Sequence, residues 1–220
     1  MNPSEIILNT ELIYKKYSVP LNVQRHMKEV AAVAEIICDN YKEEINKEEV
    51  VASCLIHDLG NLIKIDFEKK ESSVFLDKED QKRIDFFKRK QKEMRKKYGL
   101  NAEKADLIIA EEIGVNKKVL DLISHKAITI QNEEFEESTL GEKIASYADL
   151  RGSPVGVVSA EKRMDDYHKR YRFAENEEKI EHSKKFVRLV KELEKELFSK
   201  LTIKPEDITK ESIKKYVAKY

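Results

Sequence analysis

The chain has 220 residues, which is long enough to form one domain with a substantial core. Its 42 basic and 42 acidic side chains cancel, so the net charge gives no reason to expect binding to nucleic acid or to a membrane surface. The two cysteines, Cys38 and Cys54, lie in apolar runs without a C-x-x-C spacing. No apolar run approaches the ~20 residues needed to cross a bilayer, and the first residues lack the apolar block of a signal peptide. We therefore expect a cytoplasmic protein with reduced thiols and no membrane segment.

Apolar residues recur with the helical period of about 3.6 along most of the chain, and alternation with a period of two is nearly absent. This pattern predicts an all-α fold, a compact helical bundle. The first helix is expected over residues 3–17 and the second over residues 20–40. A third helix, expected over residues 47–58, is apolar on nearly every side and should lie at the centre of the bundle. Gly60 is expected to follow its end.

The second half of the predicted bundle begins with the longest irregular connection, residues 61–78, in which Phe67, Phe75 and Leu76 are available to cover a site as a partial lid. A fourth helix is predicted over residues 79–98. Further helices are predicted over residues 101–114, 116–126, 139–150, 159–173, 176–199 and 208–219. We expect residues 1–175 to form the main domain and the charged residues 176–220 to form a helical extension packed on it.

The predicted fourth helix is strongly basic. Between Gln81 and Lys97 it carries nine Lys or Arg residues and two acidic residues. If the helix lay along a cleft, it could attract nucleotides or a single strand of nucleic acid. The alternative is the solvated outer face of an amphipathic helix, whose apolar stripe includes Ile84, Phe87 and Met94.

An adjacent imidazole and carboxylate interrupt the apolar run "VVASCLIHDLG", in which His57 precedes Asp58. Burying an unpartnered carboxylate is costly, so other groups should compensate for it. Neighbouring residues of a helix point about 100° apart, so both side chains can meet one ion only near a helix end. Gly60 indicates such an end, and the partners must then come from other helices.

Two residues distant in sequence are candidate partners. His26 lies on the apolar stripe of the second helix, three residues after Val23 and four before Val30; alone, it is typical of a hydrogen-bonded core histidine. Asp149 ends an apolar helix face just before a Gly/Pro loop; alone, it is typical of a helix end. Together with His57 and Asp58 they give three helices with inward imidazoles or carboxylates, the donors that divalent metals prefer.

The order of these residues resembles the HD superfamily of metal-dependent phosphohydrolases, in which a helical histidine, a His-Asp pair and a distant aspartate follow one another. The surroundings are similar too, with "P-x-x-V-x-x-H" ending at His26, "HDLG" from His57 and "YADLR" around Asp149. The resemblance covers about residues 19–171. It implies a helical HD domain and a divalent ion, one of Mn, Mg, Co, Ni, Fe or Zn, held by His26, His57, Asp58 and Asp149. Asp58 would also be the catalytic carboxylate that orients or deprotonates a water molecule.

The chain departs from family members that bind two metals, which carry two further histidines between the His-Asp pair and the last aspartate. His125 occupies a plausible place for the second of them, but the first would fall near Asn101, where no histidine stands. We therefore expect one metal, with His125 either a second-metal ligand or a pocket residue. Arg151 and Lys64 are candidate contacts for substrate phosphate, although each is also typical of a solvated surface charge.

The sequence thus predicts a metal-dependent phosphohydrolase that acts on a nucleotide or another small phosphoester. One alternative is an HD-type nuclease or phosphodiesterase that uses the basic helix. A second is a non-catalytic regulatory domain that binds a nucleotide or a protein partner, and a third is a plain helical interaction protein. The identity of the metal, the substrate and the oligomeric state stay open at this stage.

Overall fold

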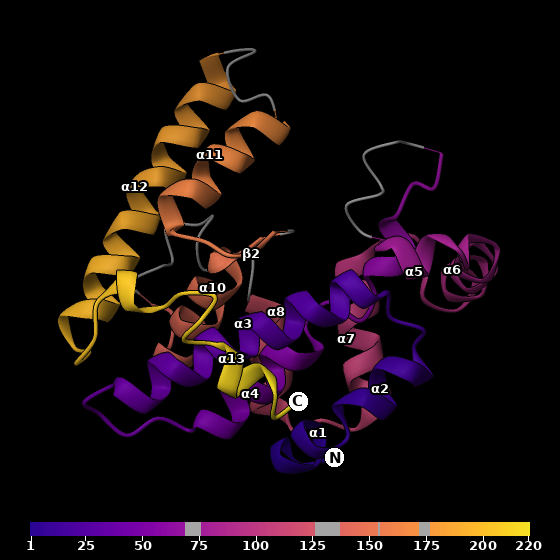
Figure 1. Cartoon of the computed structure of the whole chain (residues 1–220), viewed down its shortest axis with the longest axis horizontal. Coiled ribbons are helices and arrows are strands. Elements are labelled where there is room, and N and C mark those ends of the chain that lie inside the picture. Colours follow the sequence, from indigo (N-terminus) through magenta and orange to yellow (C-terminus); the bar gives the residue numbers. More distant parts are fainter. Residues whose placement is uncertain (69–75, 126–136, 154, 172–176) are drawn as a thin grey trace.

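The structure of the protein is a computed structural model that describes residues 1–68, 76–125, 137–153, 155–171 and 177–220. Within these ranges it is a helical bundle with one two-stranded hairpin, which confirms the predicted all-α class. Helix α4 (Lys47–Ile56) lies at the centre, where it packs against α1, α3, α8 and α10 (Figure 1). All seven residues from Val50 to Ile56 are buried, as the apolar character of this helix predicted.

The amino-terminal region contains two short helices where one was predicted. α1 (Pro3–Leu8) and α2 (Thr10–Lys16) are separated at Asn9, whose side-chain amide donates to the Glu5 carbonyl at 2.7 Å. Asparagine favours helix ends because its side chain competes for backbone hydrogen bonds. α3 (Leu21–Asn40) then buries its predicted stripe against α4. The stripe residues are Val23, Met27, Val30, Ala34 and Ile37.

The predicted fourth helix is also divided, into α5 (Lys78–Gln81) and α6 (Ile84–Tyr98). Asp80 of α5 is buried, and its carboxylate accepts a hydrogen bond at 2.6 Å from the Leu21 N–H at the start of α3. This bond supplies an acceptor to an N–H that has no partner within its own helix. The short α5 is therefore tied to the start of α3.

The connection after α4 begins with the 3₁₀ helix η1 (Asn61–Lys64), which is held by α6. The Gln91 amide donates to the carbonyls of Leu62 and Ile65 at 2.7 Å each, and the Arg95 guanidinium donates to the Ile63 carbonyl. Of the three residues expected to form a lid, Leu76 is instead buried in the core and Phe67 packs partly against it. Phe75 lies outside the described residues.

The remaining elements follow the predicted order. They are α7 (Ala102–Ile113), α8 (Lys117–His125), α10 (Leu140–Arg151), the antiparallel strands β1 (Gly152–Ser153) and β2 (Gly156–Val157), α11 (Ala160–Tyr171), α12 (Glu177–Ser199), η5 (Pro205–Asp207) and α13 (Lys214–Val217). The helix predicted over residues 208–219 is shorter, since only Lys214–Val217 are α-helical. Just before it, the Thr209 and Ser212 hydroxyl groups accept from each other's backbone N–H. None of the described helices has the length and apolarity to span a membrane.

The carboxy-terminal residues return to the centre of the bundle. α11 and α12 pack side by side at one edge, and the chain then runs back to place α13 against α3 (Figure 1). Arg151, at the end of α10, is 3 % exposed. Its guanidinium donates to the carbonyls of Val158, Pro205 and Ile208 and to the Tyr147 hydroxyl. Arg151 thus joins α10 to the carboxy-terminal segment.

Replacing Arg151 with methionine keeps the aliphatic length and removes these donors. Because several buried carbonyls would lose their partner, we expect Arg151→Met to lower the free energy of unfolding by about 3 kcal/mol. Urea denaturation followed by circular dichroism measures the change.

Arg188→Met is the matched control, since Arg188 is an exposed arginine of α12 with one ion pair to Glu192 at 3.8 Å. We expect it to change the free energy of unfolding by no more than about 0.5 kcal/mol. Equal losses in the two variants would show that the Arg151 bonds add no more than a surface arginine does.

Candidate metal centre

The end of α4 allows His57 and Asp58 to face one point. The last helical residue is Ile56, His57 is the C-cap, and Asp58 lies in the turn that follows. The Gly60 N–H donates to Oδ1 of the buried Asp106 in α7 at 2.6 Å, which holds this turn against the bundle. The helix end that the sequence indicated is therefore present at the His-Asp pair.

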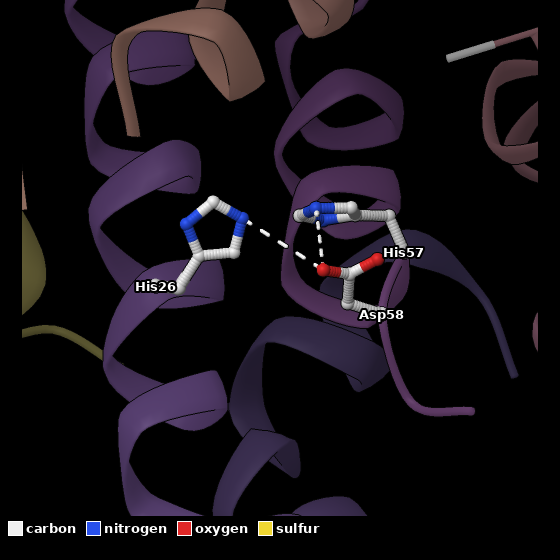
Figure 2. A group of neighbouring side chains, drawn as sticks. All are labelled: His26, His57 and Asp58. Atoms are coloured by element: carbon white, nitrogen blue, oxygen red, sulfur yellow. Dashed lines mark ion pairs between the residues drawn. The ribbon is translucent and has the colours of Figure 1, made fainter. Parts of the chain in front are cut away.

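His26 and Asp149 meet this pair from α3 and α10. The Nε2 atom of His26 lies 3.0 Å from Oδ1 of Asp149 and 3.8 Å from Oδ2 of Asp58. The Nε2 atom of His57 lies 3.4 Å and 3.7 Å from the same two oxygens. Figure 2 shows the two imidazoles and the Asp58 carboxylate pointing toward one another, with donor atoms of these three residues within 4.8 Å.

These separations suit a common divalent ion. Two donors about 2.1 Å from one ion lie roughly 3.0 Å apart at a right angle and roughly 3.4 Å apart at the tetrahedral angle. The four N–O separations in the cluster range from 3.0 to 3.8 Å. An ion therefore fits among His26, His57 and Asp58, whose donor atoms lie within 4.8 Å of one another. Asp149, whose Oδ1 is 3.0 and 3.4 Å from the two imidazole nitrogens, is the candidate fourth ligand.

Hydrogen bonds to neighbouring groups orient two of the four side chains. The Nδ1 atom of His57 lies 2.7 Å from the Cys54 carbonyl. Because a carbonyl only accepts, Nδ1 carries a proton, and Nε2 is the nitrogen that faces the cluster and is available to an ion. Oδ2 of Asp58 accepts a hydrogen bond at 2.5 Å from the side-chain amide of Asn61, which is itself buried. Sequence reasoning missed Asn61, whose place three residues after Asp58 was the available signal.

The charge of the cluster also favours a cation. Burial alone would raise the pKa of Asp149, but contacts with His57 and His26 outweigh this effect and hold the pKa well below its usual range. Asp149 therefore carries its negative charge beside a second carboxylate, that of Asp58. A divalent ion would take the place of the imidazole protons that stabilise Asp149 here and would neutralise both carboxylates, and the imidazoles, then neutral, would complete a set of donors typical of metal sites.

Gly152, which the sequence marked only as part of a loop, provides space for His26. A Cβ atom on Gly152 would lie 2.7 Å from Cε1 and 2.8 Å from Nδ1 of the His26 ring, and 3.0 Å from a methyl group of Val30. Contacts this short cannot persist, and on the other side the ring faces the carboxylates. Any side chain at position 152 would therefore displace His26 from its present position.

Three other predicted site residues lie differently. Arg151 is buried and bonded to the carboxy-terminal segment, so its guanidinium is unavailable to a substrate, and we withdraw it as a phosphate contact. Lys64 is exposed at the end of η1. His125 ends α8, where its Nδ1 lies 2.8 Å from the Asp121 carbonyl and 3.3 Å from the Glu142 carboxylate. It is not among the residues that converge with His26.

The space at Gly152 can be tested through metal affinity. An added methyl group would push the His26 ring away from the other donors, so we expect Gly152→Ala to weaken metal binding by about tenfold or more. Calorimetric titration of the metal-free protein with Mn²⁺ or Ni²⁺ measures the dissociation constant.

Gly141→Ala is the control, because Gly141 lies at the other end of α10 and its nearest neighbours are side-chain methyl groups at 3.2 and 3.4 Å. We expect this variant to bind metal as the wild type does. In a His26→Ala background the Gly152→Ala change should have no further effect on affinity. Wild-type affinity in Gly152→Ala itself would show that the ring tolerates the methyl group.

Comparisons with known proteins agree with this arrangement. A family model described as the HD domain matches residues 23–151, which is more than half of the chain and includes all four residues of the cluster. Comparisons with curated proteins and with solved structures gave no significant match. On the extent of the family match, the chain belongs to the HD domain family.

Proposed function

We propose that the protein is a metal-dependent phosphohydrolase that acts on nucleotides or other small phosphoesters. The observation that carries the proposal is the meeting of two imidazole nitrogens and two carboxylate oxygens from three helices, with N–O separations of at most 3.8 Å. Membership of the HD domain family supports the same reaction class.

His26, His57, Asp58 and Asp149 would hold the ion. When bound, a divalent metal lowers the pKa of a water molecule and polarises a phosphoryl oxygen. Two imidazoles with two carboxylates suit several first-row ions, since imidazole is typical of Zn, Fe and Ni sites and carboxylate of Mg and Mn sites. We propose one ion, because His125 bonds its own helix and Glu142 instead of joining the four.

Asp58 is the proposed catalytic carboxylate. Its Oδ2 atom faces both imidazoles, and the Asn61 amide fixes its orientation. Asp106 accepts a hydrogen bond from Gly60 in the turn after α4, and Gln91 binds the Leu62 carbonyl in the η1 segment that follows. The backbone that carries the Asp58 carboxylate is therefore fixed by neighbouring helices. A carboxylate held in this way can orient a water molecule toward phosphorus and accept its proton.

The charges of α6 favour a small substrate over a nucleic acid strand. Four lysines of this basic segment form ion pairs at 2.7–2.8 Å, which are Lys82–Glu79, Lys88–Glu68, Lys90–Glu93 and Lys97–Glu112. Phe87 of α6 is buried in the core, so Phe86 is the aromatic residue of this helix next in line to stack on a base. Its ring already lies near the guanidinium groups of Arg83 and Arg89, which are 4.6 and 5.7 Å from the ring centre. Single-strand binding needs a continuous basic groove with aromatic faces free for stacking. We therefore propose a solvated outer face for α6, and we keep Lys64 as the candidate phosphate contact.

The proposed reaction is tested by elemental analysis of the purified chain and by a phosphate-release screen with added Mn²⁺, Mg²⁺, Co²⁺ and Ni²⁺. We expect metal-dependent release from small phosphoesters. Asp58→Ala should remove a ligand and the proton acceptor together, and should lower the rate by about 100-fold or more.

His125→Ala is the companion variant and should keep most metal binding and activity. Stoichiometric loss of a second metal in His125→Ala would show that the site holds two ions. A chain that binds metal but releases no phosphate from any substrate would instead favour a regulatory domain.

Substrate size is tested by a side-by-side assay of mononucleotides and a short labelled oligonucleotide with the preferred metal. We expect turnover of the mononucleotides and little cleavage of the oligonucleotide, because α6 offers few unpaired cations and no free stacking face. Efficient, salt-sensitive cleavage of the oligonucleotide, lost when Lys88, Arg89 and Lys90 are neutralised, would establish a nuclease.

A further inference from the structure

A second concave surface lies beside His26, on the outer side of α3. It is a groove of about 630 Å³ between α3, the tip of the β1–β2 hairpin and residues 210–218. Arg25 and Glu29, which flank His26 along α3, line one wall. The hairpin that forms another wall begins at Gly152, the residue in contact with the His26 ring. The groove therefore adjoins the metal centre through His26 and is of a size that small ligands occupy.

Three cations from separate segments face this groove: Arg25 of α3, Lys210, and Lys214 of α13. Lys214 pairs with Glu211 at 2.5 Å, and Arg25 donates to the amide oxygen of Asn22. Within the described part of the chain, neither Arg25 nor Lys210 forms an ion pair with a carboxylate. In a chain of zero net charge this is a local excess of positive charge.

Glu29 is the carboxylate among the described lining residues. Burial raises the pKa of Glu29, against the opposing effects of His26, Arg25 and Lys210. Glu29 is thus close enough to Arg25 and Lys210 to interact with both, and as a carboxylate it offsets part of their charge. One carboxylate beside three cations still leaves the groove with an excess of positive charge.

A glycine of the hairpin leaves room for Lys210 beside the groove. Gly156 has a φ of +103°, and a Cβ atom there would lie 2.9 Å from Cε and 3.4 Å from Nζ of Lys210. The lysine stem thus lies across the hairpin backbone where another residue would carry a side chain. Any side chain at position 156 would therefore displace Lys210 from its present place beside the groove.

The remaining walls are apolar. Ile213 is buried at the base of the groove and Val217 lines it, while Val155 at the hairpin tip is 71 % exposed. Cations beside an apolar surface suit a molecule that combines an anionic group with an apolar or planar body. An inorganic anion would contact the cations of the groove but not its apolar walls.

We propose that this groove binds a phosphate group of a small phosphorylated molecule, with Arg25 and Lys210 as its cationic contacts. The phosphate is either a second phosphate of the molecule hydrolysed at the metal centre or that of a separate effector. The first source rests on the proposed hydrolase function, whereas the groove itself does not. A phosphate dianion would gain two charge-assisted contacts from Arg25 and Lys210.

The binding test uses the full chain after metal removal with a chelator and inorganic pyrophosphate as the probe, followed by calorimetry. We expect binding that the Arg25→Met/Lys210→Met double variant weakens by about tenfold or more, because each change removes a charge but keeps the stem. Lys215→Ala is the matched control, since Lys215 is exposed on the same helix as Lys214 and lies over the Tyr216 ring at 4.8 Å. It should bind pyrophosphate as the wild type does.

A second pair of variants tests the charge of the groove without removing any of its contacts. Val155→Glu places a negative charge at the exposed rim and should weaken pyrophosphate binding, whereas Val155→Gln should not. Absence of pyrophosphate binding at millimolar concentration would overturn the proposal, as would equal affinity in wild type, the double variant and Val155→Glu.

The two sources are separated with the metal-loaded protein. If the substrate provides the phosphate, Val155→Glu raises KM for a nucleoside diphosphate relative to the monophosphate. If a separate effector provides the phosphate, Val155→Glu leaves the ratio of the two KM values unchanged. Added pyrophosphate then alters the rate of the wild type but not the rate of Val155→Glu. A protein that releases no phosphate at all would count against the hydrolase function, while the calorimetry of the metal-free chain still decides the groove.

Discussion

The candidate metal centre depends on one geometric constraint, the end of α4 at Ile56. In a continuing helix, His57 and Asp58 would point about 100° apart and could not face one ion. Here His57 is the last residue near helical geometry and Asp58 already belongs to the turn. Neighbouring helices hold this turn, since Asp106 of α7 bonds the Gly60 N–H and Gln91 of α6 bonds two carbonyls of the next segment. Much of the helical bundle is therefore needed to hold one dipeptide in place.

The end of α10 also positions groups of the cluster, and three nearby residues make different contacts there. Asp149 faces the imidazoles, Arg151 binds carbonyls of the carboxy-terminal segment, and Gly152 leaves room for the His26 ring. The carboxy-terminal residues are further joined to α3, because Lys219 pairs with the buried Glu35 at 2.7 Å. Residues beyond position 200 thus support two of the three helices that supply donors, although none of them belongs to the cluster.

The sequence predicted the helical class, the central place of α4 and the buried stripe of α3 because these depend on local periodicity. The resemblance to the HD superfamily supplied the four residues that meet in space. Arg151 was misplaced because sequence proximity to Asp149 does not reveal which way a side chain points. Asn61 and Gly152 were missed because their roles are contacts, a hydrogen bond to Asp58 and an approach to His26, made only in the folded chain. The break at Asn9 was missed because it involves a side-chain to backbone bond, and the tie between Asp80 and the start of α3 was missed because it forms only in the folded chain.

The close approach of Gly152 to His26 also bears on which divalent ions the site prefers. The His26 ring has backbone on one side and the carboxylates on the other, so it cannot retreat to enlarge the cluster. Two of the donors in the cluster are imidazole nitrogens, Nε2 of His26 and Nε2 of His57. Calcium prefers six to eight oxygen ligands at about 2.3–2.6 Å in a flexible arrangement. Two imidazole nitrogens disfavour such an ion by donor type, and the backbone at Gly152 keeps the His26 ring within the cluster, so a single glycine contributes to discrimination between calcium and the transition-metal ions that imidazole binds.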